Sequence, residues 1–304
     1  MNSTAFLGSK KIGLEILKTM HRIAPQALSV IMALDDRQDG RSCLDKFCDF
    51  AASVDKPLRV ISKNADLEKV IEEFRPDFCM VNGYYRILKP DLLARFPAGC
   101  MGIHGSLLPK YRGGSPLVWS ILNGDKQSGI SLFYFDDGMD TGDLIGQRSY
   151  TIERDDSIAD ILSKVERLSV ELIEENYVNL LNNTAQKIKQ DHSQATYAAI
   201  RLPQDGKINW NWTAKRIHDF IRAQTAPYPG AFCSLEDSSK LTVWKSEVFD
   251  FPFHGTPGQV VQVNAESVIV SASEGTAVVL LDVQKEGNEP QKASKILRFN
   301  SRLL

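Results

Sequence analysis

The stretch from Cys100 to Gln147 constrains the fold of this chain more than any other segment. Cys100 to Ile103 is short, apolar and flanked by glycine, which predicts a buried strand ending at His104. Ile130 to Phe135 predicts a second strand, which runs into an aspartate-rich loop, DDGMDTG, containing Asp140. We therefore expect the imidazole and the carboxylates to meet in the crevice at the carboxyl ends of an open α/β sheet.

The residues before this stretch alternate between apolar runs and amphipathic helical patterns. Such alternation predicts a doubly wound, mostly parallel sheet of the α/β class. A well-capped helix is predicted from Ser157 to Leu181. From Thr196 onward, strand-like runs separated by Gly and Pro predict a smaller β-barrel. We expect a catalytic domain at 1–195 and a C-terminal domain at 196–304.

Charge and composition limit the partners. The chain has 36 basic and 38 acidic residues, so nothing in its charge favours a polyanion such as nucleic acid. Five scattered cysteines without a C-x-x-C motif suit a reducing cytosol. No apolar run reaches the roughly 20 residues that span a bilayer. We expect a cytoplasmic protein without a membrane partner, and no metal, because the aspartate loop lacks the order of a calcium site.

The residue types of this stretch suit acyl transfer. A histidine can stabilise a developing oxyanion, and a nearby carboxylate can orient that histidine or take a proton from an amine. There is no G-x-S-x-G nucleophile motif, and Ser106 lies in no such motif. Direct attack by an external amine is therefore favoured over an acyl-enzyme.

HGSLLPKYRG followed by DDGMDTG resembles the signature of the formyltransferases that use 10-formyltetrahydrofolate. PYPGAF at 227–232 and LTVW at 241–244 resemble the C-terminal domain of the members that act on tRNA or nucleotide sugars. The resemblance covers the whole chain. It implies a Rossmann-like catalytic domain followed by an OB-like β-barrel.

By position, His104 matches the catalytic histidine of this family and Asp140 its catalytic aspartate. The third family residue, an asparagine two before the histidine, is Gly102 here. Loss of one oxyanion donor typically costs roughly 10²–10³ in rate. Asn82, at the end of a neighbouring predicted strand, is a candidate replacement.

The resemblance also implies two sets of binding residues. The segment Tyr84 to Leu88 would wrap the pterin of the folate, although an aromatic pair in a loop can equally be packing. The first loop would border the second substrate, and a plain strand-to-helix turn is an equal alternative there. Lys110 and Arg112 would approach a phosphate or the folate tail, or else be solvated loop charges. The candidates for folate are Tyr84, Tyr85, Arg86, Ile87, Leu88 and Asp137, and those for the acceptor are Ser9, Lys10, Ser106, Lys110 and Arg112.

Among family members, the C-terminal motifs look closest to the nucleotide-sugar N-formyltransferases. The expected function is N-formylation of a nucleotide-linked deoxyamino sugar by 10-formyltetrahydrofolate. In methionyl-tRNA formyltransferases a longer, basic insertion grips the tRNA, whereas the corresponding segment here, DDRQDG at 35–40, is short and acidic. Methionyl-tRNA formylation is the alternative enzyme function, and a folate- or nucleotide-binding protein with weakened catalysis is the alternative class. A homodimer is also considered, since the apolar stretches 249–253 and 278–281 could be core or interface.

Overall fold

The computed structural model describes residues 1–304, which divide into two compact units. The first unit comprises residues 1–114, 128–150 and 163–198, and the second comprises 115–127, 151–162 and 199–304. The change between units after Ala198 lies close to the predicted boundary at 195/196. Two short segments of the predicted catalytic domain, 115–127 and 151–162, belong instead to the second unit.

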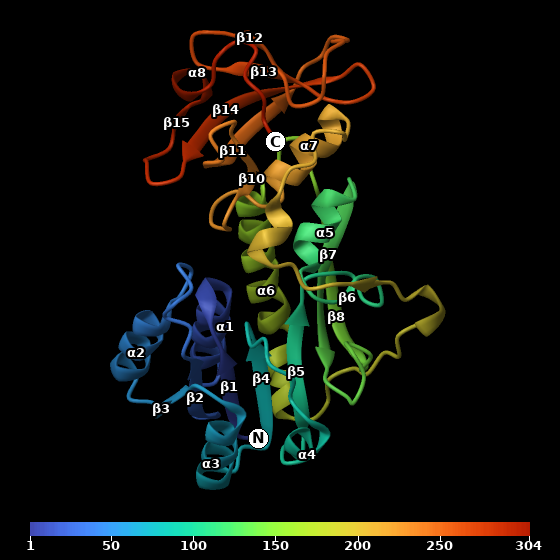
Figure 1. Cartoon of the computed structure of the whole chain (residues 1–304). Coiled ribbons are helices and arrows are strands. Elements are labelled where there is room, and N and C mark those ends of the chain that lie inside the picture. Colours follow the sequence, from blue (N-terminus) through green and yellow to red (C-terminus); the bar gives the residue numbers. More distant parts are fainter. The chain divides into compact units, whose positions relative to one another are not determined.

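A seven-stranded sheet forms the centre of the first unit, in the order β3-β2-β1-β4-β5-β7-β8 (Figure 1). Its first five strands are parallel to their neighbours, which confirms the predicted α/β class. Apart from β3 at the edge, these strands consist mostly of buried apolar residues, as parallel strands covered on both faces do. The strands are β1 (Thr4–Gly8), β2 (Leu28–Leu34), β3 (Leu58–Ile61), β4 (Phe78–Asn82), β5 (Gly99–His104), β7 (Gln127–Tyr134) and β8 (Leu144–Thr151).

Strand β7 runs antiparallel to β5, with His104 opposite Ser131 and Met101 opposite Tyr134. The aspartate-rich loop therefore leaves β7 beside the start of β5. His104 lies at the other end of β5. The prediction that both strands end in one crevice was wrong, because an apolar run does not reveal strand direction. The loop can approach His104 only by running back along the sheet.

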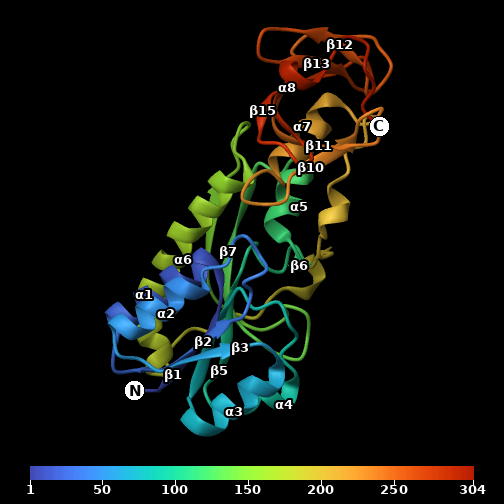
Figure 2. The ribbon, with the colours of Figure 1, turned by 60° about the vertical axis from the view of Figure 1, so that its left-hand side comes forward.

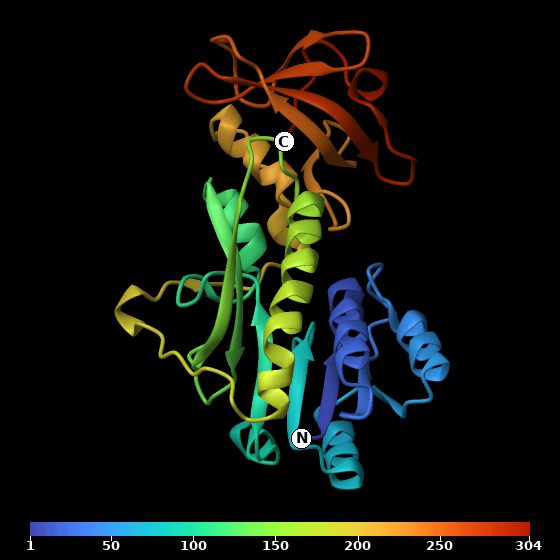
Figure 3. The ribbon, with the colours of Figure 1, turned by 180° about the vertical axis from the view of Figure 1, so that it is seen from behind.

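Helices cover both faces of this sheet. Right-handed crossovers place α1 and α2 on one face and α3 and α4 on the other (Figure 2). Helix α6 lies alongside α1 (Figure 3), where Lys11 and Arg22 form ion pairs with Glu166 and Glu174. The helices are α1 (Lys10–Ile23), α2 (Leu44–Ser53), α3 (Asn64–Phe74), α4 (Pro90–Leu93) and α6 (Ile158–Leu181).

The second unit combines helices α5 (Pro116–Leu122), α7 (Ala214–Arg222) and α8 (Ala293–Ile296) with an antiparallel sheet. The strand order is β10-β11-β14-β13-β12, and β15 pairs with β14. No pairing joins β10 to β12, so the closed barrel stays a prediction. The strands are β10 (Ala231–Ser234), β11 (Lys240–Val248), β12 (Val260–Val263), β13 (Val268–Ser271), β14 (Ala277–Lys285) and β15 (Gln291–Lys292).

Apolar side chains from α7 and the sheet form the core of the second unit. Val278 and Leu280, from a stretch considered above as core or interface, belong to this core. Phe251 is 70% exposed beside Phe249. No helix of the chain combines the length and the apolar content needed to cross a bilayer.

Candidate active site

His104 ends β5 with its imidazole buried between two oxygen groups. Its Nε2 lies 2.8 Å from the backbone carbonyl oxygen of Tyr111. Because a carbonyl can only accept a hydrogen bond, we assign the proton to Nε2. Its Nδ1 lies 3.6 Å from Oδ2 of Asp140. The imidazole is thus oriented by a backbone oxygen on one side and faces a carboxylate on the other.

Asp140 reaches His104 from a constrained loop. Its backbone has a φ of 53°, in the left-handed region that aspartate tolerates better than most residues. The same Oδ2 atom that faces His104 accepts a 2.7 Å hydrogen bond from the backbone N–H of Gly113. The carboxylate is therefore tied to the glycine-rich loop that follows the histidine strand.

This geometry assigns distinct tasks to the two imidazole nitrogens. Since the Nε2 proton is committed to Tyr111, Nδ1 of His104 carries a lone pair. It can accept a proton passed on by Asp140, and only then can it donate a hydrogen bond to an oxyanion. A separation of 3.6 Å is longer than a hydrogen bond, and catalytic contacts commonly tighten when substrate binds. The arrangement suits proton transfer coupled to oxyanion stabilisation.

Gly102 and Asn82 present opposite faces of the sheet. A Cβ atom built on Gly102 would lie 2.8 Å from two ring carbons of Phe135 and 2.7 Å from the carbonyl oxygen of Val81. Asn82 follows Val81, which pairs with Gly102, so its side chain alternates to the other face. There its Oδ1 lies 3.5 Å from a Cβ built on Gly13 of α1. The structure does not bring the Asn82 amide to the face of His104.

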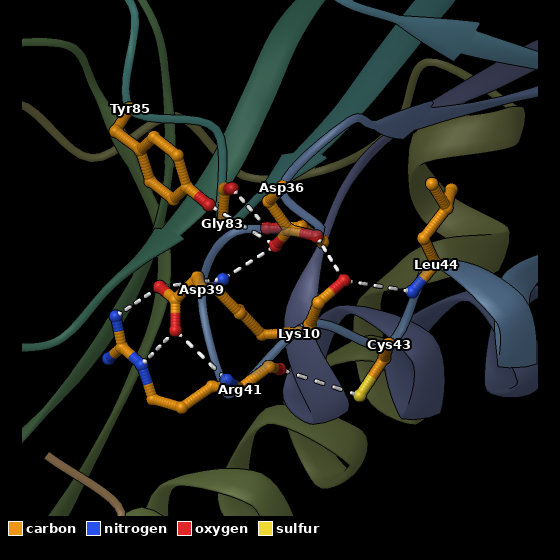
Figure 4. Close-up of polar contacts among 10 residues, drawn as sticks. Lys10, Asp36, Asp39, Arg41, Cys43, Leu44, Gly83 and Tyr85 are labelled. Carbon is orange, nitrogen blue, oxygen red and sulfur yellow. Dashed lines mark hydrogen bonds and ion pairs between the residues drawn. The ribbon is translucent and has the colours of Figure 1, made fainter.

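Lys10, expected to contact the acceptor, is held by carboxylates of the loop after β2 (Figure 4). Its Nζ lies 2.5 Å from Asp36 and 2.9 Å from Asp39. Burial lowers the pKa of Lys10, but the hydrogen bonds to Asp36 and Asp39 outweigh it, so the pKa is raised. Hydrogen bonds from Arg41 hold the pKa of Asp39 well below its usual range. Lys10 is a paired cation at the edge of a pocket of about 420 Å³ lined by the Asp35–Asp39 loop and Tyr85.

The other predicted acceptor residues differ in availability. The hydroxyl of Ser9 donates to the carbonyl of Gly83 at 2.6 Å, and that of Ser106 donates to the carbonyl of Lys110. Arg112 is buried, and its guanidinium donates to Gln190 and His192. Lys110 is exposed. Only Lys110 among these four offers a side chain to solvent.

The predicted folate segment follows β4. The Tyr84 hydroxyl donates to Asn64 at 2.5 Å, and Asn64 donates to the carbonyl of Ile87 at 3.0 Å. Burial raises the pKa of Tyr84. Ile87 is 84% exposed and Tyr85 is 56% exposed, so this segment offers apolar surface.

The remaining folate candidates behave differently from one another. Leu88 packs into the core below the segment, whereas Arg86 and Asp137 are exposed. No group of three or more His, Cys, Asp or Glu side chains is placed to hold a metal ion.

Three residues that contact the histidine–aspartate pair were not predicted from the sequence as site residues. The carbonyl of Tyr111 orients His104, and the N–H of Gly113 binds Asp140. Gln190 donates from Nε2 to the carbonyls of Asp140 and Gly142. Tyr111 and Gly113 act through backbone groups, so the residue type at these two positions does not reveal their role. Gln190 lies in a polar run that reads from sequence as a linker.

The fold and this pair define the class of protein. Residues 37–176 match the family described as formyl transferase, and residues 202–301 match the formyl transferase C-terminal domain. The chain belongs to this family, and it is a formyltransferase.

Individual relatives differ in the substrate that their names state. A methionyl-tRNA formyltransferase from Acetivibrio thermocellus is 33% identical over 282 residues, covering 90% of this chain and 89% of the relative. The sugar 3N-formyltransferase WlaRD, solved in the presence of dTDP and 5-N-formyl-THF, has a TM-score of 0.67 at 22% identity. The match covers 95% of this chain and 99% of that chain.

An N-formyltransferase from Helicobacter canadensis, in complex with folinic acid and dTDP-3-aminofucose, has a TM-score of 0.68 at 22% identity. The match covers 92% of this chain and 99% of that one. At this identity the likeness to both solved structures shows the shared fold alone.

Proposed function

We propose that the protein N-formylates the amino group of a nucleotide-linked deoxyamino sugar, with 10-formyltetrahydrofolate as the donor. The amine nitrogen attacks the formyl carbon, the bond from that carbon to the folate nitrogen breaks, and one proton moves from the amine to the released tetrahydrofolate. Asp140 takes the amine proton and passes it to Nδ1 of His104, which then donates a hydrogen bond to the oxyanion and releases that proton to the departing tetrahydrofolate nitrogen. The pair at 3.6 Å supports this division of labour.

The segment after β4 fits a folate donor. Tyr85 and Ile87 expose apolar surface that a pterin ring would cover, and Asn64 fixes the backbone beneath them. The backbone carbonyls of such a fixed segment are suited to the amino and ring N–H groups of a pterin. Solved structures of similar fold contain 5-N-formyl-THF or folinic acid, which supports the same donor class.

The observation that carries the choice of acceptor is the charge balance of the loop after β2. Arg37 pairs with Asp35 at 2.9 Å and Arg41 pairs with Asp39 at 2.7 Å, while Lys10 pairs with Asp36. The basic side chains of this loop are thus committed to its own aspartates. A surface that neutralises several tRNA phosphates needs uncommitted cations, whereas one nucleoside diphosphate needs few.

Methionyl-tRNA formylation is the second candidate. It is favoured by relatives that are 33% identical to this chain and whose names state that activity. A catalytically weakened binding protein is the third. Against it stands the histidine–aspartate pair, in which both side chains are oriented by backbone groups.

The test is tetrahydrofolate release from 10-formyltetrahydrofolate with UDP- and dTDP-linked amino sugars, and separately with methionyl initiator tRNA. The proposal expects turnover with at least one sugar nucleotide and none above background with tRNA, and His104→Ala should abolish it. Turnover with tRNA alone would replace the proposal by the second candidate. Folate binding without turnover on any acceptor would favour the third.

A further inference from the structure

The segment Ile188–Ala198, which we name the strap, lies against both loops of the histidine–aspartate pair. It follows α6 in the chain and ends at Ala198, the last residue of the first unit. Ile188 exchanges two backbone hydrogen bonds with Leu144, at 2.7 and 2.8 Å, just after the aspartate loop. Its other end forms a short parallel ladder, β9 (Tyr197–Ala198) on β6 (Arg112–Gly113). The strap is thus anchored to the loop that follows His104 and to the residue that begins the strand after Asp140.

Thr196 fixes the loop that orients the histidine. The backbone N–H of Tyr111 donates to Thr196 Oγ1 at 2.8 Å, and the backbone N–H of Arg112 donates to the Thr196 carbonyl at 2.8 Å. The Tyr111 carbonyl is the group that accepts the Nε2 proton of His104. The strap therefore sets the position of the group that holds the imidazole.

Gln190 fixes the loop that carries the aspartate. Its Nε2 donates to the carbonyl of Asp140 at 2.8 Å and to that of Gly142 at 2.7 Å. These two bonds hold the left-handed backbone at Asp140, a conformation that persists only when the surroundings determine it. Gln190 is 5% exposed, so water does not compete for these bonds.

Arg112 determines which way the Gln190 amide points. Its guanidinium donates to Gln190 Oε1 from both Nε and Nη2, at 3.3 and 2.7 Å, and Nη2 lies 3.1 Å from His192 Nδ1. A guanidinium has donors only, so the amide oxygen must face Arg112 and the amide NH₂ must face the two carbonyls. Arg112 is 1% exposed, and its guanidinium contacts the amide oxygen of Gln190 and a ring nitrogen of His192. The burial of Arg112 is explained if its role is to bond to Gln190 and His192 of the strap.

We infer that Gln190, oriented by Arg112, is a positioning residue for formyl transfer: it holds the aspartate loop so that the Asp140 carboxylate faces Nδ1 of His104. Gln190 is buried and acts through the backbone of the aspartate loop. A displacement of about 1 Å in a catalytic group can cost on the order of a hundredfold in rate. The inference rests on the proposed roles of His104 and Asp140, and not on the identity of the acceptor.

Two substitutions separate positioning from simple packing. Gln190→Glu keeps an oxygen acceptor for Arg112 but removes the donors to the carbonyls of Asp140 and Gly142. Gln190→Leu removes both. If Gln190 serves only to satisfy Arg112, the Glu variant behaves as the parent protein. If it positions Asp140, both variants are impaired.

The matched control is Tyr177→Phe, which removes a buried hydroxyl bonded to Thr4 Oγ1 at 3.1 Å, away from both loops. We expect this variant to lose stability without any change at the histidine–aspartate pair.

The first measurement is hydrogen–deuterium exchange of the free, full-length proteins, which requires no acceptor. We expect faster exchange at 136–144 in both Gln190 variants than in the parent and in Tyr177→Phe. Unchanged exchange at these residues in both variants would overturn the inference, even if no acceptor of the panel is turned over.

The second measurement is steady-state turnover with whichever acceptor the panel identifies. We expect kcat to fall about tenfold to a hundredfold in Gln190→Glu and Gln190→Leu, with the KM of both substrates unchanged and kcat of Tyr177→Phe at the parent level. Faster exchange accompanied by the parent kcat would also overturn the inference.

Discussion

The ring of Phe135 fills the space beside Gly102 in which a larger side chain would lie. A Cβ on Gly102 would come within 2.8 Å of Cε1 and Cζ of Phe135, closer than real contacts allow. Phe135 also packs against the face of the sheet covered by α3. The glycine at the position of the family asparagine thus packs against Phe135. The missing asparagine side chain is replaced by an aromatic ring from the neighbouring loop.

Gly102→Ala should lower the free energy of unfolding by about 1–3 kcal/mol, because the added methyl group overpacks this site. Gly102→Asn should do so at least as strongly, without raising turnover, because Phe135 blocks the asparagine side chain. Denaturant unfolding and tetrahydrofolate release measure the two effects.

The double variant Gly102→Ala/Phe135→Leu serves as the control for this pair. It should lose less stability than the two single variants added together, since the smaller side chain makes room for the methyl group. The relief should be partial, because the Val81 carbonyl is also close. Strict additivity would show that the two residues do not interact.

Asp140→Asn should lower kcat about 10²–10⁴-fold, the range for loss of a positioned acid or base. An asparagine oxygen can still accept from the Gly113 N–H, so thermal unfolding should change little. Asp136→Asn, in the same loop, should keep the parent kcat, because its bonds to Gly138 and Thr141 need only an acceptor oxygen. Equal loss in both variants would indicate loop disruption in place of lost chemistry.

Lys10→Met should lower the free energy of unfolding by about 1–3 kcal/mol, because Asp36 would keep its buried charge without the cation. The double variant Lys10→Met/Asp36→Asn should recover part of this loss. If Lys10 instead binds the acceptor directly, KM for the acceptor would rise more than tenfold while the unfolding temperature of the single variant stayed at the parent value.

The stability of the second unit should fall as the pH falls below about 6.5. Burial, and then the nearby Arg222, lower the pKa of His218 in the folded protein, whose Nδ1 lies 3.1 Å from Ser246 Oγ. The unfolded chain titrates near 6.5, so it binds the proton first. Stability is therefore complete above that pH and is lost toward the lower folded pKa, by at most about 1.4 kcal/mol per pH unit.

His218→Gln isolates this contribution. Denaturant unfolding between pH 5 and 7.5 should show a flatter pH dependence for the variant than for the parent. Parallel curves would exclude His218 as the source.

Sequence patterns predicted the helices and strands well where apolar residues recur at a single helical or strand-like spacing. The helix predicted from Ser157 to Leu181 is α6, and the strand predicted from Cys100 to Ile103 lies within β5. Strand β8 was missed because Gln147, Arg148 and Ser149 interrupt its apolar character. Strand direction was also missed, since pairing with β5 is decided by tertiary contacts that no local window contains.

The histidine–aspartate pair followed from motifs, and the structure places these side chains 3.6 Å apart. The reason for their proximity was not available from the sequence. It depends on a loop that turns back along the sheet and on Gln190, which is 50 residues from Asp140 in the chain. The placement of Lys10 against Asp36 likewise joins two loops that follow separate strands.

The central claim, transfer of a formyl group to a sugar nucleotide in preference to tRNA, is tested most directly by competition. The acceptor sugar nucleotide and methionyl initiator tRNA are mixed at equal concentration with donor carrying an isotopically labelled formyl group, and both products are quantified by mass spectrometry. The product ratio gives the ratio of kcat/KM values. The account predicts that nearly all label reaches the sugar amine, and label found mainly on the methionyl amine would contradict it.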